Sequence, residues 1–185
     1  MKHVIYFLFG FMLLFKTVSA QTRYSMPVKP MATKLINKEI LYNDVLSQSN
    51  YDIHIVTVFT NYCPGTPYFF QRIKTLDSMG YKNIHWVCCS SADLKDSLET
   101  IQTMKKYGVY VDTVYLIHSK QYKEDKADDR YKGFLFRKDV CKPCKRDVIG
   151  VPYTIIYDNK GRVLDKGYKK SPESILDVLS KLKKE

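Results

Sequence analysis

The sequence predicts an α/β domain in which helices flank a central mixed sheet of parallel strands with a C-terminal antiparallel hairpin. Three observations predict it. Residues 53–59 form a nearly uninterrupted apolar run rich in β-branched side chains, as in a strand buried on both faces. Strand-like and helix-like segments then alternate, which is typical of a parallel sheet. Near the end, a turn at 158–161 joins two strands, and a last helix follows.

The N-terminal residues predict export. Lys2 and His3 precede an uncharged run at 4–15, and Thr-Val-Ser-Ala follows at 17–20, which is the pattern of a secretory signal peptide cleaved after Ala20. The run is shorter than the roughly 20 apolar residues that span a bilayer. We therefore expect a mature protein in the periplasm or outside the cell, with membrane contact only through an uncleaved signal segment.

The segment that precedes the first strand is polar and mixed. Residues 21–50 are expected to form an N-terminal leader, with a short helix over 31–46. The domain proper is then predicted over 51–185.

The first half of the domain reads as strand, helix, strand, helix, strand. After the strand at 53–59, helical spacing predicts a helix that begins near Pro67 and ends before Gly80. Further strands are expected over 83–88 and 109–118. The helix between them is expected to bury one apolar face, made of Leu94, Leu98, Ile101 and Met104.

The second half begins with a charged, tyrosine-rich stretch at 119–138, which is too long for a tight connection and is interpreted as an insertion. A strand at 152–157 and its hairpin partner at 162–165 follow. The last helix is predicted with Ser171 as its cap and Pro172 at its first position.

Composition narrows the range of partners. The chain has 185 residues, 30 Lys and Arg against 19 Asp and Glu, and a formal net charge of +11. No basic stripe with a recognisable nucleic-acid motif is present, so we expect no nucleic-acid partner. An acidic protein partner or the membrane surface remains open.

Five cysteines lie in the part of the chain that is expected to be exported. Because disulfides persist in such compartments, thiols there are either paired or kept reduced for a purpose. The odd number leaves at least one cysteine unpaired within a monomer, and this favours a redox function.

Cys63 is the first candidate nucleophile. It stands in FTNYCPGTPY, residues 59–68, where the first strand passes into a helix. The N–H groups and the dipole at a helix N-terminus favour the thiolate, which is the attacking species in disulfide exchange. A lone cysteine near an apolar strand can also be an inert core residue. Thr66, three residues later, could donate a hydrogen bond to the sulfur but cannot resolve a mixed disulfide.

Cys141 and Cys144 form a C-x-x-C motif a few residues before Pro152. Three alternatives remain open: a structural disulfide, a redox pair that resolves or recharges Cys63, and a metal site. A tetrathiolate zinc site needs a second pair with suitable spacing, which the chain does not offer. We therefore predict no metal and no cofactor.

Cys88 and Cys89 end the second strand. Because side chains alternate along a strand, one of them is expected in the core and the other outside. The outer one would be a secondary thiol that can pair with Cys63 or with the C-x-x-C motif.

The element order and two local patterns resemble the thioredoxin superfamily. The patterns are VTVFTNYCPGT at 56–66 and VIGVPYTIIYDNKGRVLDKGY at 148–168. The exported bacterial thioredoxin-like proteins of the TlpA and ResA kind are the most similar group. The resemblance covers roughly 51–182 without the insertion. It implies a thioredoxin-like fold, with a C-x-x-T variant of the C-x-x-C active-site motif.

The resemblance also implies roles for residues around Cys63. The Val151–Pro152 bond would be cis and would pack against the cysteine, and the backbone at Val151 would pair with a substrate peptide. Tyr62 stands near the place of the family's tryptophan and would contact substrate.

Three functions follow as alternatives. The leading one is an exported thiol-disulfide oxidoreductase that acts on protein thiols or disulfides through Cys63, together with a redox partner protein. The second is a thiol peroxidase, because Thr60 and Cys63 match the T-x-x-C of peroxiredoxins and residues 63–67 are similar to the C-x-x-T-P of glutathione peroxidases. The third is a non-catalytic binding module that uses the groove at Pro152.

Overall fold

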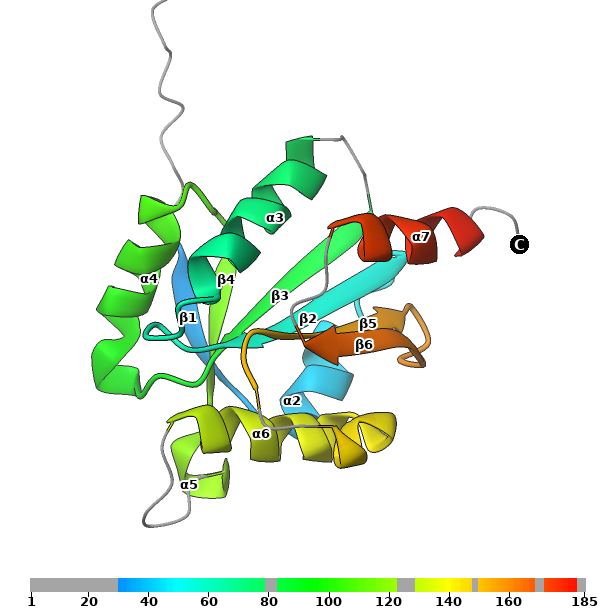
Figure 1. The fold of residues 1–185 in the computed structure, drawn as a ribbon. Coiled ribbons are helices and arrows are strands. Elements are labelled where there is room, and N and C mark those ends of the chain that lie inside the picture. The colour runs from blue at the N-terminus through cyan, green and yellow to red at the C-terminus, as the bar shows by residue number, and fades with distance from the viewer. Residues whose placement is uncertain (1–29, 79–82, 123–128, 148–149, 169–171, 183–185) are drawn as a thin grey trace, which may run out of the picture.

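The computed structural model describes residues 30–78, 83–122, 129–147, 150–168 and 172–182 (Figure 1). The predicted signal peptide, Gly80 and Ser171 lie outside these ranges. Six strands form one sheet in the order β1-β4-β3-β2-β5-β6. The strands are β1 (Ala32–Ile36), β2 (Ile53–Phe59), β3 (Ile84–Ser90), β4 (Thr113–Ile117), β5 (Tyr153–Asp158) and β6 (Val163–Tyr168).

The sheet is mixed, as the sequence predicts. Strands β1, β4, β3 and β2 are parallel to one another, whereas β5 is antiparallel to both β2 and β6. Strand β2 is therefore central, and all seven of its residues are buried. Its nearly continuous apolarity follows from burial on both faces.

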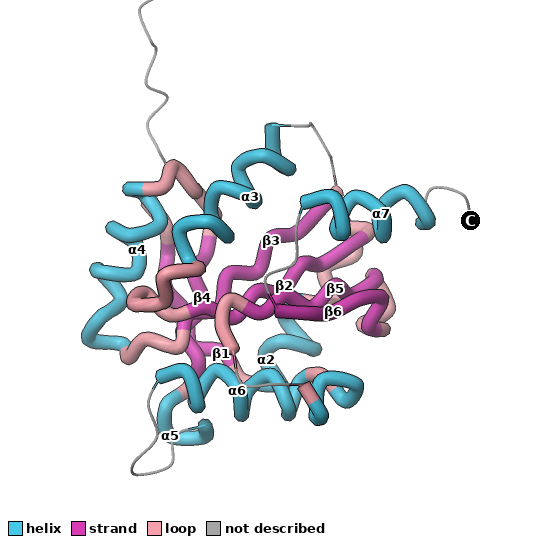
Figure 2. The backbone as a smooth tube through the Cα atoms, in the orientation of Figure 1, coloured by secondary structure: helices cyan, strands magenta, loops and turns pink. Residues whose placement is uncertain are grey.

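Helices cover both faces of the sheet (Figures 1 and 2). On one face lie α3 (Thr66–Ser78), α4 (Ser97–Lys106) and α7 (Pro172–Leu182). On the other lie α2 (Lys38–Ile40), α5 (Ser119–Tyr122) and α6 (Asp129–Val140). Short helical turns complete the fold: the π-helical η1 (Leu41–Val45) and the 3₁₀ turns η2 (Leu94–Asp96) and η3 (Lys142–Arg146). No helix within the described ranges is long and apolar enough to cross a membrane.

The helix predicted over 31–46 is wrong in its first half. Residues Ala32–Ile36 form β1, which pairs in parallel with the outer edge of β4, and only the part from Lys38 onward is helical. Pairing with β1 satisfies backbone groups that the edge of β4 would otherwise leave open. Part of the expected leader is thus a strand of the sheet.

The stretch 119–138, interpreted from the sequence as an insertion, contains α5 and most of α6, and these helices cover the second face of the sheet. Helix α6 places Phe136 and Val140 in the core cluster on the second face of the sheet, together with Val58 of β2. These side chains and the buried Gly133 follow one another at helical spacing, so α6 is an amphipathic helix whose inner stripe packs on the sheet.

The buried face predicted for the second helix is wrong at its N-terminal end. Leu94 and Leu98 are 61% and 70% exposed, whereas Thr100 and Met104 are fully buried. Leu94 lies in the 3₁₀ turn η2, before α4 begins, whereas Leu98 and Met104 both lie in α4. At about 100° per residue, Leu98 and Met104 point to different sides of that helix, so Leu98 does not share the buried face.

Candidate functional site

Cys63 lies in the loop between the end of β2 at Phe59 and the start of α3 at Thr66. Its side chain is partly exposed, and it is a free cysteine. The backbone N–H of Gly65 points at Sγ with an N···S distance of 3.4 Å, while the Cys63 thiol donates to the carbonyl oxygen of Val151 at 3.0 Å. The loop thus gives the sulfur one backbone donor and one backbone acceptor.

The carbonyl beside the sulfur belongs to the segment that leads into β5. The Val151–Pro152 peptide bond is cis. Val151 is 4% exposed and packs in the same core cluster as Cys63. The thiol–carbonyl bond exists only while the sulfur carries its proton, because a thiolate has no hydrogen to donate.

The suggested hydrogen bond from the Thr66 hydroxyl to the Cys63 sulfur does not form. Its hydroxyl donates to the carbonyl oxygen of Thr60 at 2.8 Å, and its side chain is fully buried. A hydroxyl has a single hydrogen, so this bond uses its donor. Thr66 therefore closes the Cys63 loop on itself and holds it against the end of β2.

Helix α6 approaches this loop from the second face of the sheet. A Cβ atom added to Gly133 would lie 2.9 Å from Cγ1 of Val58 and 3.8 Å from Cγ1 of Val151. Only glycine permits this spacing, because real Cβ atoms do not come so close to a packed methyl group. The first turn of α6 is thereby brought beside Cys63.

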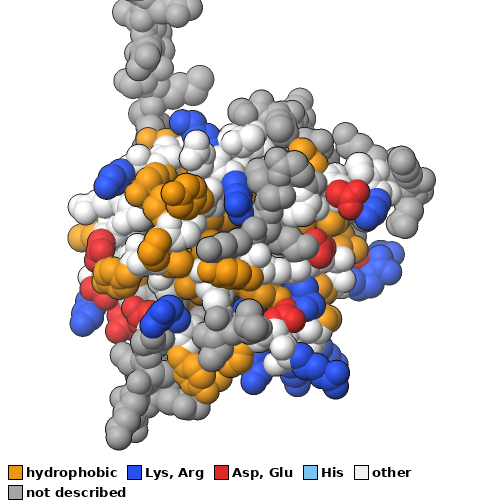
Figure 3. Space-filling view, viewed as in Figure 1, with side chains coloured by type: hydrophobic (Ala, Val, Ile, Leu, Met, Phe, Trp, Pro, Cys, Tyr) orange, Lys and Arg blue, Asp and Glu red, His pale blue; other side chains and the backbone are white. Residues whose placement is uncertain are grey.

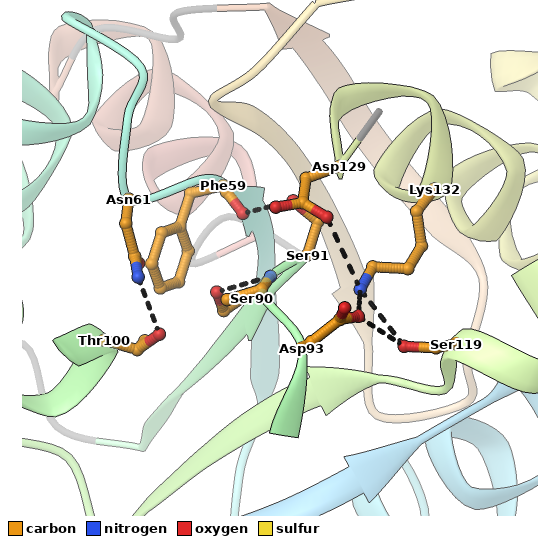
Figure 4. A network of polar contacts seen from close by, with 10 residues as sticks. Phe59, Asn61, Ser90, Ser91, Asp93, Thr100, Ser119, Asp129 and Lys132 are labelled. Atoms are coloured by element: carbon orange, nitrogen blue, oxygen red, sulfur yellow. Dashed lines mark hydrogen bonds and ion pairs between the residues drawn. The ribbon is translucent and has the colours of Figure 1, made fainter. Parts of the chain in front are cut away.

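A buried lysine fixes that first turn (Figure 4). Only 1% of the Lys132 side chain is exposed, and its Nζ lies 2.8 Å from Asp93, 3.8 Å from Asp129 and 3.3 Å from the Ser119 hydroxyl. Asp93 follows β3, and Ser119 begins α5, so one ammonium group ties three elements together. The carboxylate of Asp93 makes no capping hydrogen bond to η2.

A cavity of about 320 Å³ opens between the Cys63 loop and α6. Its lining is mainly apolar, and it consists of Thr60, Tyr62, Cys63, Pro64, Asp129 and Arg130. Tyr62 is 66% exposed at its rim. The Glu99 carboxylate raises the pKa of the Tyr62 phenol, with smaller contributions from desolvation, Asp96 and Asp129.

A polar cluster anchors the segment that carries Val151. Asp147 accepts a hydrogen bond from the Tyr153 hydroxyl and forms a 2.6 Å ion pair with Lys166 of β6. The bond from Lys166, followed by that from Tyr153, lowers the pKa of the Asp147 carboxyl. The Arg137 guanidinium of α6 stacks on the Tyr153 ring at 3.9 Å. Both ends of the loop before β5 are thus fixed.

Cys141 and Cys144 form a disulfide, and neither side chain is exposed. The bond closes η3, whose Lys142, Lys145 and Arg146 are exposed. In the space-filling view, Lys and Arg side chains gather at the lower right, over η3 and the end of α6 (Figure 3). Cys141 and Cys144 are thus bonded to each other and not to Cys63.

The expectation that one of Cys88 and Cys89 faces outward is wrong. Cys88 packs with Phe70 and Met104 on one face of the sheet, and Cys89 packs with Phe136 on the other. Both are buried because α6 covers the second face. Burial raises the pKa of Cys88 to about 12 and that of Cys89 well above its usual range. Neither is a ready nucleophile.

Within the described residues, no group of three or more His, Cys, Asp or Glu side chains could hold a metal ion. The site residues that the sequence did not reveal are Asp129, Arg130 and Lys132 of α6. The signal was present as an apolar spacing through Gly133, Phe136 and Val140, but the surrounding charges concealed it.

No protein-family model and no curated protein matches the chain in sequence. Solved structures do match the fold. A thioredoxin-related protein from Neisseria meningitidis serogroup B aligns with a TM-score of 0.50 and 14% identity, over 76% of this chain and 91% of that one. The thioredoxin domain of a thiol-disulfide oxidoreductase from Bacteroides vulgatus aligns with a TM-score of 0.50 and 13% identity, over 72% and 80%. The predicted thioredoxin-like fold is thereby confirmed.

Proposed function

Given a thioredoxin-like fold, we propose that the chain is an exported thiol-disulfide oxidoreductase that works through the single thiol of Cys63. The observation that carries this proposal is the setting of that sulfur. Cys63 is the one free cysteine of the five that is not buried, and it faces the carbonyl of Val151 before a cis proline.

The reaction proceeds in two exchange steps. The Cys63 thiolate attacks one sulfur of a substrate disulfide, which forms a mixed disulfide and releases the other substrate sulfur as a thiol after it takes up a proton. Since Thr66 replaces the second cysteine of a C-x-x-C motif, an external thiolate from a redox partner attacks the substrate sulfur of the mixed disulfide. A disulfide between partner and substrate forms, and Cys63 leaves as a thiolate, which restores it. The Cys141–Cys144 bond serves the fold and takes no part.

The backbone around Val151 supplies a place for the substrate peptide. Its carbonyl already accepts a hydrogen bond from the resting thiol. An incoming backbone N–H that takes over this acceptor adds an extended peptide beside the loop and frees the thiol proton. Export fits the apolar run at 4–15 and places the reaction in a compartment where disulfides persist.

The test is reduction of insulin disulfides by dithiothreitol in the presence of the mature chain. Wild type is expected to accelerate the reaction, Cys63→Ser to abolish the acceleration, and the double variant Cys141→Ser with Cys144→Ser to retain it if it stays folded by circular dichroism. Equal rates with wild type and Cys63→Ser would refute the proposal. Hydrogen peroxide consumption that depends on Cys63, without insulin reduction, would favour the peroxidase alternative.

A further inference from the structure

The cavity beside Cys63 has a far wall that the exchange chemistry does not require. Tyr62 and Pro64 of the cysteine loop form one side, and Asp129 and Arg130 of α6 form the other. The volume of about 320 Å³ exceeds that of a single large side chain and reaches the lower range of ligand pockets. The cavity therefore has room for one residue of a substrate that is bound at Cys63.

The far wall is rigid. Lys132 is almost fully buried and holds Asp129 through its Nζ, while the same Nζ is bound to Asp93 at the end of β3 (Figure 4). One residue further on, Gly133 lies so close to Val58 that α6 cannot move inward. A rigid wall selects by shape, since it does not collapse around a smaller side chain.

The chemistry of the lining favours an aromatic ring. The Tyr62 ring and the Pro64 ring offer flat apolar surfaces, against which another ring packs with a large buried area. Arg130 lies on the opposite wall, and guanidinium groups bind the faces of aromatic rings more strongly than they bind aliphatic chains. A leucine side chain would fill the cavity less well, and alanine would leave it open.

We propose that this cavity is a specificity pocket for peptide substrates that carry an aromatic residue next to the reacting cysteine. The inference rests on the proposed function, because the pocket acts only on peptides that Cys63 attacks. Binding of the ring aligns the substrate sulfur with Sγ before the exchange step. Cys63 then forms a bond to the peptide sulfur, and the bond between the two substrate sulfurs breaks, with the leaving thiolate taking up a proton.

The experiment uses short neutral peptides with one cysteine activated as a 2-pyridyl disulfide. Attack by Cys63 transfers the peptide to Sγ and releases pyridine-2-thione, which is followed by absorbance, and mass spectrometry identifies the peptide adduct. Three peptides carry phenylalanine, leucine or alanine beside the cysteine, in versions with that residue before and after it. We expect the phenylalanine peptide to react about tenfold faster than the alanine peptide, with leucine between them.

Two variants locate the preference. Tyr62→Ala is expected to reduce the ratio of the phenylalanine to the alanine rate to about one. Arg130→Gln is expected to bring the phenylalanine rate down to the leucine rate. The matched control is Tyr68→Ala, because Tyr68 is 69% exposed, as Tyr62 is 66% exposed, but does not line the cavity. Tyr68→Ala should keep the full preference.

The outcomes separate the two proposals. Transfer of all three peptides at the same rate, or the same loss of preference in Tyr68→Ala as in Tyr62→Ala, would overturn the specificity pocket and leave the exchange reaction intact. Absence of any Cys63 adduct in wild type, with adduct formation by free cysteine under the same conditions, would overturn the exchange reaction and the pocket with it.

Discussion

The ammonium group of Lys132 belongs to a buried side chain, of which only 1% is exposed to solvent. A buried ammonium group is tolerated only with partners, and its main partner is Asp93 at 2.8 Å. The two charges are not equally buried, because 27% of the Asp93 side chain is exposed. Removal of one partner leaves the other charge unpaired, and this costs more folding free energy when the buried ammonium is left than when the partly exposed carboxylate is left.

This asymmetry gives a prediction for two substitutions. Asp93→Asn leaves the buried ammonium without its main counter-charge and is expected to lower the free energy of unfolding by about 3 kcal/mol. Lys132→Met keeps the side-chain volume and leaves a carboxylate that water can reach, so about 1 kcal/mol is expected. Urea denaturation measures both.

The exposed ion pair between Lys181 and Asp177 on α7 provides the control. Its side chains are 72% and 61% exposed. Asp177→Asn should leave the urea midpoint within the error of wild type. If Lys132→Met cost more than Asp93→Asn, the burial argument would be wrong.

At the scale of elements, β2 and β3 meet in register at a pair of histidines. His54 and His85 are partners across the two parallel strands, and their Nδ1 atoms lie 3.1 Å apart. Tyr51 stacks on the His85 ring with centroids 4.5 Å apart. One ring must donate and the other accept, so the two imidazoles cannot both be protonated while this hydrogen bond is present. Burial lowers the pKa of His54, and burial together with His54 lowers the pKa of His85 to about 4, although Asp158 and Asp112 act in the opposite direction.

The pair predicts loss of stability in mild acid. Because the folded pKa values lie below the unfolded value of 6.5, the unfolded chain binds protons first, and stability falls as the pH drops from about 6.5 to about 4. About 2 kcal/mol is expected, after allowance for the partial exposure of His85. Urea unfolding at several pH values measures the loss. In His85→Phe the slope over this window should shrink, and an unchanged slope would assign the effect to other groups.

Elements whose signal is local could be predicted from the sequence. Strand β2, helix α3 and the hairpin of β5 and β6 each carry their own pattern, and each lies where it was expected. Strand β1 could not be predicted in this way, because it is short, contains the polar Thr33 and Lys34, and depends on β4, far along the chain. Its strand character comes from pairing rather than propensity.

Helix α6 was missed for a different reason. Two cations, Lys132 and Arg137, lie on its buried side, with 1% of each exposed. Buried charges break the apolar stripe on which helix prediction rests, so the helix read as a solvated insertion. Cys63 and Pro152 could be identified because the family resemblance carries them. The cavity wall of Asp129 and Arg130 could not, since it depends on α6.

At the scale of the whole molecule, the five cysteines occupy four different environments. Cys63 is partly exposed at the loop, Cys88 and Cys89 lie in the cores on opposite faces of the sheet, and Cys141 and Cys144 are bonded. Thiol reactivity requires both access and ionisation, and burial raises the pKa of both core thiols. The folded domain as a unit therefore decides which sulfur can react.

Alkylation with iodoacetamide at about pH 8 should reveal three levels, counted by intact mass. The folded chain should take up one label, at Cys63, because it is the only free cysteine of the five that is not buried. The chain unfolded without reductant should take up three, since unfolding exposes Cys88 and Cys89 but leaves the Cys141–Cys144 bond intact. Unfolding with reductant should give five. A folded chain with no reactive thiol would mean that Cys63 is bonded, and the single-thiol mechanism would then have to give way to one with a resolving partner.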